Sequence, residues 1–421
     1  MISVKEFKDR RERLYQELED GSVLVLFAGV AKKSSGDECY DFIVNRNFQY
    51  LTNIDQEGSI LIATKLDGQV IEYLFVSEYD EVKEKWTGKR LTSNEASKLS
   101  GITNVLYLNT YDVQLSMILD RKAHTYGEFS TLYLDMEPDN KIGEDRTTRE
   151  VKELLGANYS YLQFKDIYKN IILLRMVKSA QEIEELKEAI SKTNIGLTRI
   201  LKAIKPGLYE YQLSSLFEYT IKDYDYSEIS FDTIAASGIN ATTLHYPNPK
   251  DKLKDGDLML FDLGARNNSY CADISRTYPI NGKFTDLQKV IYGIVLECNK
   301  MVIKTVKPGM TIAELQQKVV DFLARRCLEE GLIKDLTEIR RYYFHNISHH
   351  IGLDTHDPSD RTLPLVSGNV ISDEPGLYFK ELGIGVRIED DLLITDDGCY
   401  VLSGNIIKEI KDIERAMLYR E

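Results

Sequence analysis

Four of the six histidines in this chain fall between His345 and His356. The neutral imidazole ring is a common metal ligand, and its charge changes near neutral pH. Three apolar residues, Ile347, Ile351 and Leu353, interleave with these histidines, so we expect the segment to be partly buried. Buried histidines without partners would be costly. The cluster therefore predicts a functional site. The alternative, a solvent-exposed surface segment, does not explain the interleaved apolar residues.

Two aspartates flank a predicted hairpin. The segment 257–277 reads as two strands around Asn267-Asn268, and Asn tolerates the positive φ that a two-residue turn requires. If these two residues form the turn, residues whose numbers sum to 535 lie opposite each other. Asp262 would then face Asp273 with their Cβ atoms about 5 Å apart.

Two glutamates repeat this arrangement. Glu374 lies in the predicted strand 370–378 and Glu389 in the predicted strand 383–391, with a loop around 381–383 between them. The midpoint between the two glutamates falls inside that loop. This pair could therefore also face each other across a hairpin.

Facing carboxylates need compensation, because two unit charges about 4 Å apart repel by about 4 kcal/mol at an effective dielectric near 20. A single pair could share a proton, as paired catalytic acids do. Two pairs beside a histidine cluster are more easily reconciled with two divalent cations about 3.5–4 Å apart, which would activate a shared water. The alternative, surface acids on polar strand faces, suits either pair alone better than both pairs together.

Composition disfavours several classes of partner. The net charge of −14 disfavours nucleic acid or an anionic membrane surface. The charged N-terminus lacks the apolar core of a signal peptide, and no apolar run approaches the ~20 residues that span a bilayer. The five cysteines are scattered without a Cys-x-x-Cys pattern. We therefore expect a cytoplasmic protein with reduced thiols.

The chain of 421 residues divides into two predicted domains, 1–172 and 173–421. The first alternates helices and strands, and the second has long helices followed by hairpins, the first helix opening at Ser179. The elements expected in the first domain are a helix over 4–19 and strands over 23–27, 59–64, 70–76, 105–108 and 131–134.

A repeated sequence motif divides the second predicted domain into two halves. Ile204-Lys-Pro-Gly207 recurs 102 residues later as Val306-Lys-Pro-Gly309. Each copy lies between two helical stretches and precedes strands that carry acids. This order predicts a duplicated half-domain, with one pair of acids from each half meeting at a pseudo-twofold interface.

These residues and their contexts resemble the dinuclear metallopeptidases of the pita-bread fold, and most closely the Xaa-Pro aminopeptidases (aminopeptidase P), with prolidase as a near relative. The matching blocks are 244–246, 261–264, 272–279, 348–352, 374–378 and 386–391, and in the first domain 40–52 and 86–90. The resemblance covers nearly the whole chain. It implies an α/β N-terminal domain of the creatinase/prolidase type, which forms oligomers and narrows the cleft, and an α+β pita-bread catalytic domain.

The resemblance also implies a ligand set for two divalent metal ions. Asp262 would chelate one ion, His349 and Glu374 the other, and Asp273 and Glu389 would bridge them, with a hydroxide between the ions as the nucleophile. Oxygen-rich ligation with one imidazole suits Mn²⁺, which is the metal we expect. The implied reaction is removal of the N-terminal residue from peptides with proline in the second position.

Further roles follow from the same resemblance. His245 and His356 would orient the substrate and stabilise the tetrahedral intermediate, His345 and Arg387 would lie beside the proline pocket, and Glu374 would also shuttle a proton. The expected assembly is a homodimer or homotetramer, with peptides as partners and neither nucleic acid nor membrane.

Two alternatives stay open at this stage. A prolidase would cleave only dipeptides, and a metal-free binding or scaffold protein could use the same fold. Departures from the family pattern at Asn346, at Asp373 and over 357–360 leave the substrate preference open.

Overall fold

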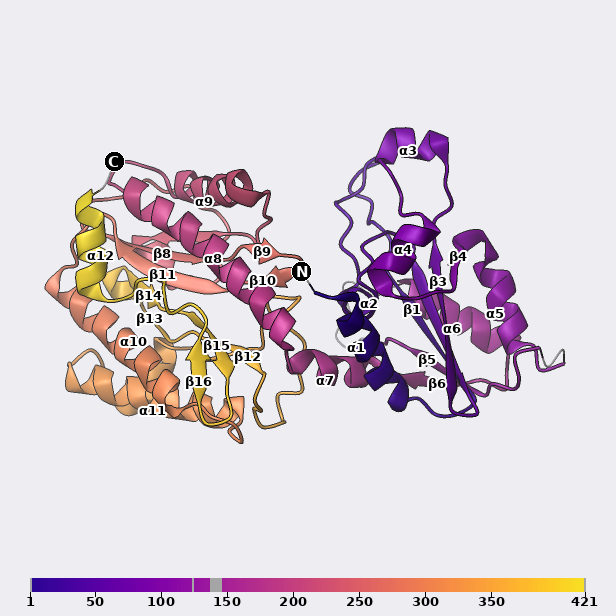
Figure 1. Cartoon of the computed structure of the whole chain (residues 1–421). Helices are drawn as coiled ribbons and strands as arrows, with labels where there is room; N and C mark the ends of the chain where they lie inside the picture. The colour runs from indigo at the N-terminus through magenta and orange to yellow at the C-terminus, as the bar shows by residue number, and fades with distance from the viewer. Residues whose placement is uncertain (1, 123–124, 137–145, 420–421) are drawn as a thin grey trace. The chain divides into compact units, whose positions relative to one another are not determined.

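The computed structural model describes residues 2–122, 125–136 and 146–419 (Figure 1). The chain forms two compact units, Ile2–Arg175 and Met176–Glu421. The division lies three residues after the boundary expected from the sequence, near the end of helix α7 (Tyr168–Met176). Each unit is described by itself below.

The N-terminal unit is built on one six-stranded mixed sheet in the order β4-β3-β2-β1-β5-β6. Strand β1 is buried along its whole length, pairing antiparallel with β2 and parallel with β5. The predicted α/β class is confirmed, and β6 is a strand that the sequence did not reveal. The strands are β1 (Ser22–Phe27), β2 (Ile60–Leu66), β3 (Gln69–Val76), β4 (Val105–Tyr107), β5 (Thr131–Leu134) and β6 (Gln163–Asp166). The helices besides α7 are α1 (Val4–Gln16), α2 (Arg46–Thr52), α3 (Glu81–Thr87), α4 (Ser93–Ser100), α5 (Tyr111–Leu119) and α6 (Arg146–Asn158).

The C-terminal unit repeats one order of elements, two long helices followed by strands. Helix α8 begins where the sequence predicts, because Ser179 caps it and forms a capping box with Glu182. The first half contains α8 (Ala180–Ala203), α9 (Glu210–Asp225), β7 (Ile234–Ser237), β8 (Leu258–Leu263), β9 (Arg266–Asn267), β10 (Tyr270–Cys271) and β11 (Ile274–Pro279). The second half contains α10 (Asp286–Thr305), α11 (Ile312–Glu329), β12 (Val370–Asp373), β13 (Gly376–Phe379), β14 (Ile384–Arg387), β15 (Asp390–Ile394) and β16 (Cys399–Val401), and α12 (Ile410–Ala416) follows.

The two Lys-Pro-Gly turns have the same backbone geometry. Gly207 and Gly309 have φ values of 93° and 88°, which favour glycine. The Gly207 N–H donates to Leu253 O (2.9 Å), and the Gly309 N–H donates to Leu365 O (2.8 Å). In each half the acceptor leucine also donates its own N–H to the residue after the glycine, Leu253 to Leu208 O and Leu365 to Met310 O. Each turn lies between two helices that contact each other, α8 with α9 and α10 with α11 (Figure 1). This repetition supports the predicted duplication.

The first hairpin has a different register from the expected one. Asn268 and Ser269 take positive φ values of 45° and 71°, so they form the turn, and Tyr270 pairs with Asn267. Asp262 consequently pairs with Ser275 instead of Asp273. The predicted register was wrong by two positions. Because a shift of two preserves the side-chain face, the two aspartates still point to the same side.

The second hairpin has the predicted register. Gly376 pairs with Arg387, and the 3₁₀ turn Lys380–Leu382 ends at Gly383, whose left-handed conformation reverses the chain. Continued outward by two residues, this register places Glu374 opposite Glu389. The expectation that these two glutamates face each other is confirmed.

Candidate metal centre and active site

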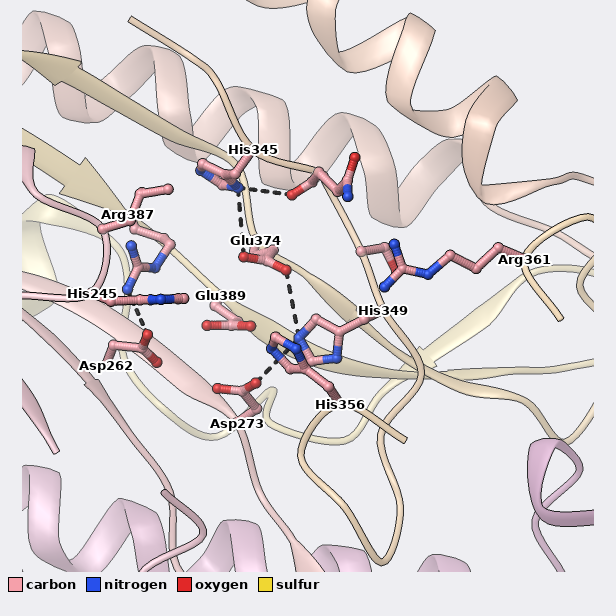
Figure 2. Close-up of a pocket in the computed structure, with 13 residues that line it drawn as sticks. His245, Asp262, Asp273, His345, His349, His356, Arg361, Glu374, Arg387 and Glu389 are labelled. Carbon is pink, nitrogen blue, oxygen red and sulfur yellow. Dashed lines mark hydrogen bonds and ion pairs between the residues drawn. The ribbon is translucent and has the colours of Figure 1, made fainter. Parts of the chain in front are cut away.

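Five side chains from five separate segments converge on one space in the C-terminal unit. Asp262 comes from β8, Asp273 immediately precedes β11, and His349 lies in the loop before β12. Glu374 lies between β12 and β13, and Glu389 between β14 and β15. Figure 2 shows the four carboxylates around this space with the His349 ring beside them. The sequence-predicted ligands are therefore brought together.

The ligand atoms form overlapping groups. Atoms of His349, Glu374 and Glu389 lie within 4.8 Å of one another, and so do atoms of Asp262, Asp273 and Glu389. Glu389 belongs to both groups, as a bridging ligand would. A third group within the same limit contains Asp273, His349 and His356, so geometry alone also admits His356 as a ligand.

The His349 ring is oriented for ligation by its other nitrogen. Its Nδ1 lies 3.0 Å from the carbonyl oxygen of His350, which fixes the proton there. Nε2 therefore presents its lone pair and lies 3.3 Å from Asp273 Oδ2 and 3.5 Å from Glu374 Oε1. A carbonyl acceptor behind a histidine ligand is a usual feature of metal sites.

The electrostatics of these acids also suit bound cations. Burial, followed by repulsion from Asp262, Asp391 and Glu374, raises the pKa of Asp273 well above its usual value. Burial and repulsion from the other acids similarly raise the pKa of Glu389. Oδ1 of Asp262 is buried and has no hydrogen-bond partner in the part of the chain that the structure describes. Buried, repelling oxygen ligands with one imidazole fit divalent metal ions.

Arg387 ties the ligand Asp262 to the wall of the site. Its Nη2 donates to Asp262 Oδ2 (2.6 Å), its Nη1 donates to the Tyr378 hydroxyl (3.1 Å), and its Nε donates to Ser275 Oγ (2.6 Å). Ser275 in turn donates to Glu389 Oε2 at 2.8 Å. Although burial alone would lower the pKa of Arg387, Tyr378 and Asp262 raise it well above its usual value. Arg387 is therefore a permanent buried cation beside the carboxylates.

His345 and His356, two histidines outside the ligand set, have lowered pKa values. Burial and the nearby Arg387 lower the pKa of His345 to about 4, and its Nε2 lies 3.0 Å from the Tyr378 hydroxyl. Partial burial and His349 lower the pKa of His356 to about 4. The His349 and His356 rings lie 4.0 Å apart between centroids.

Two adjoining cavities open onto this centre. The first, of about 210 Å³, is lined by all nine predicted site residues together with Leu244, Asn346, Ser348 and Arg361. The second, of about 510 Å³, shares His245, Asp262, Asp273 and His356 with the first and has a wall of Phe231, Tyr246, Pro247 and Pro249. Sequence reasoning missed Arg361, Ser275 and Tyr378. Arg361 lies five residues after His356, but nothing in its local sequence separates it from a surface arginine.

Comparisons with known proteins agree with this geometry. Residues 184–396 match the family described as metallopeptidase family M24, and residues 7–126 match the N-terminal domain of aminopeptidase P. The Xaa-Pro aminopeptidase of Escherichia coli (strain K12) is 31% identical over 99% of this chain and 98% of its own length. A Bacillus anthracis structure, proposed there to be an aminopeptidase P, is 41% identical with a TM-score of 0.96, covering 100% of this chain and 99% of that one. A zinc-substituted E. coli aminopeptidase P is 30% identical with a TM-score of 0.91, covering 100% and 99%.

The chain therefore belongs to metallopeptidase family M24. Its full-length relatives place it with the Xaa-Pro aminopeptidases, and the expectations of a pita-bread fold and a metallo-aminopeptidase that uses divalent metal ions are confirmed. Among the described residues no helix has the length and apolarity needed to cross a membrane.

Proposed function

We propose that this protein is a dinuclear-metal aminopeptidase that removes the N-terminal residue from peptides with proline in the second position. The observation that carries the proposal is the convergence of Asp262, Asp273, His349, Glu374 and Glu389 into two ligand groups that share Glu389. A related E. coli aminopeptidase P, 30% identical with a TM-score of 0.90, has been solved with the inhibitor Pro-Leu. That dipeptide has the form of a product left after the residue before proline is removed.

The charges around the centre support two divalent ions. Four carboxylates converge on the centre, and one buried guanidinium, that of Arg387, pairs with them directly. Once all four are ionised, the surplus of negative charge is one that divalent cations would compensate. The four are Asp262, Asp273, Glu374 and Glu389. Since burial raises the pKa of Asp273, Glu374 and Glu389, metal binding would displace protons from them.

The chain's own residues account for the remaining chemistry. Divalent ions held by these ligands would supply Lewis acidity, which polarises a scissile carbonyl and lowers the pKa of a bound water. Glu374, whose pKa burial raises, accepts a proton from the attacking water and delivers it to the proline nitrogen. His245 and His356 line the space beside the ligands and stabilise the developing oxyanion. His345 and Arg387 are both hydrogen-bonded to the Tyr378 hydroxyl, and they form the wall beside the proline ring of the substrate.

The finer assignments belong to the same proposal. Mn²⁺ is the proposed metal, because four carboxylates with one imidazole suit it. The net charge of −14 supports peptides as partners in place of nucleic acid or membrane. We further propose a cytoplasmic homodimer or homotetramer whose N-terminal domain forms subunit contacts and narrows the cleft.

One observation favours a second candidate, a dipeptidase of the prolidase type. Arg361 lines the smaller cavity, where a guanidinium could bind the free carboxylate of a dipeptide's proline. Rates with Gly-Pro, Gly-Pro-Leu and Gly-Ala-Leu separate the two readings. Release of glycine from Gly-Pro-Leu, with Gly-Ala-Leu cleaved at least tenfold more slowly, supports the aminopeptidase. Cleavage of Gly-Pro alone would replace it with the dipeptidase.

A further inference from the structure

A second polar cluster lies directly behind the metal ligands. It consists of Arg276, Asn299, Asp373, Asp390 and Lys408, of which all but Lys408 are fully buried. Asp373 immediately precedes the ligand Glu374, and Asp390 immediately follows the ligand Glu389. In the register of β12 and β15, Asp373 and Asp390 pair directly. The cluster therefore includes one residue from each of the two chain segments that carry the glutamates.

Arg276 connects Asp390 with the backbone of Glu389. Its Nη1 donates to Glu389 O (2.5 Å) and to Ser275 O (2.9 Å), and its Nη2 donates to Asp390 Oδ1 (2.8 Å). Its remaining hydrogen bonds reach the C-terminal segment, with Nε donating to Ile407 O and Nη2 to Ile406 O, both at 3.2 Å. Arg276 thus links the backbone of Glu389 to residues 406 and 407, which belong to no strand or helix.

Lys408 and Asn299 complete the cluster. Lys408 Nζ donates to Asp390 Oδ2 and, at 2.8 Å, to Asn299 Oδ1. The Asn299 amide on α10 donates to Asp373 Oδ2 (2.9 Å) and to Asp390 Oδ2 (3.0 Å). One amide therefore crosslinks the residues beside the two ligands. Without Lys408, the one cation left in this cluster beside the two facing buried aspartates would be Arg276, which pairs with Asp390.

We propose that Lys408 and Asn299 are positioning residues of the metal centre, and that through them the C-terminal segment 403–408 sets the separation of Glu374 and Glu389. The inference rests on the proposed dinuclear function. Partners behind metal ligands typically contribute about 10- to 100-fold to metal affinity. Removing Lys408 would also take away an ion-pair partner of the Asp390 carboxylate, so the chain that carries the neighbouring Glu389 would shift.

The test is Mn²⁺ binding by the full-length, metal-stripped protein, measured by calorimetry for wild type, Lys408→Met, Lys408→Arg and Lys192→Met. Lys192 is the matched control, because it is also a buried lysine of the C-terminal unit, with its Nζ 2.6 Å from Asp225 and 2.8 Å from Asn267. Neither of these partners adjoins a ligand in the sequence, whereas Asp390, the partner of Lys408, adjoins Glu389. The visible absorption of Co²⁺-loaded protein reports the ligand geometry independently of activity. Asn299→Ser serves as a second variant if Lys408→Met does not fold.

Lys408→Met is expected to weaken Mn²⁺ binding by about 10- to 100-fold and to change the Co²⁺ spectrum, while Lys408→Arg restores both. Lys192→Met is expected to lower the melting temperature and to leave the Mn²⁺ affinity within about twofold of wild type. Equal affinities in Lys408→Met and wild type, or equal losses in Lys408→Met and Lys192→Met, would overturn the inference. Failure of the wild type to bind Mn²⁺ would instead overturn the proposed function.

Discussion

Glu374 and Glu389 face each other at the junction of two strand pairs that share one register. Asp373 pairs with Asp390 on one side of them, and Gly376 pairs with Arg387 on the other. The glutamates interrupt this ladder and turn their carboxylates toward His349, within 4.8 Å of one another. Bound cations would supply charge that compensates the repulsion between the two carboxylates.

Metal binding should stabilise the protein through Glu389. Saturation at 100 times the dissociation constant stabilises a folded protein by about 2.7 kcal/mol, so added Mn²⁺ should raise the melting temperature of the stripped wild type. Glu389→Gln should abolish the increase, because Glu389 belongs to both ligand groups. Thermal scans with and without Mn²⁺ measure this. An undiminished increase in the variant would place the ions elsewhere.

Alanine variants of His349 and His356 should differ in which property they lose, bound metal or catalytic rate. His349→Ala is expected to lose bound metal, because its Nε2 is aimed at the carboxylates. His356→Ala is expected to retain the metal and to lose about 10²- to 10³-fold in kcat, the usual cost of removing an oxyanion donor. Metal analysis beside steady-state kinetics distinguishes them. Loss of metal in His356→Ala would make His356 a ligand, as its place in the third group allows.

Arg387→Met should be most destabilising when no metal is bound. The change leaves Asp262 without the guanidinium that lies 2.6 Å away, and breaking a buried pair in this way costs about 3–5 kcal/mol. Bound cations would compensate Asp262 in its place, so Mn²⁺ should recover much of the lost stability. Urea denaturation of the variant in both states gives the comparison. A loss unaffected by metal would show that Asp262 is not a ligand.

Two glycines should respond in opposite directions to alanine. At Gly264 a Cβ would lie 1.8 Å from the backbone oxygen of Ala272, so Gly264→Ala should cost about 3 kcal/mol or more and weaken metal binding. At Gly293, inside α10, a Cβ meets nothing within 4 Å. Gly293→Ala should therefore stabilise the helix by about 1 kcal/mol. Similar effects at the two positions, measured by denaturant midpoints, would contradict the close approach at Gly264.

The two hairpins show how far the sequence determines the site. The second register was predictable because Gly383 supplies the left-handed residue that the turn requires. The first was not, because Asn267, Asn268 and Ser269 all tolerate turns, and the chain uses Asn268-Ser269. The ligands still converge, since the period-2 alternation of a strand survives a shift of two positions.

The residues that sequence reasoning missed act through tertiary contacts. Ser275 relays between Arg387 and Glu389, and Tyr378 joins Arg387 to His345, yet both are ordinary strand residues in the sequence. Lys408 lies more than a hundred residues from its partner Asn299 and belongs to no helix or strand. Spacing predicts the facing carboxylates and the histidine cluster, and the family resemblance implies the ligand roles. The groups that contact these side chains emerge only when the chain is folded.

The most direct test of the central claim is a titration of the metal-stripped protein with Mn²⁺, following bound metal and release of glycine from Gly-Pro-Leu in the same samples. We predict two ions bound per chain, no cleavage without metal, and a rate that reaches its full value as the second site fills. Cleavage without metal, full activity with one ion, or two bound ions without any cleavage would contradict the account.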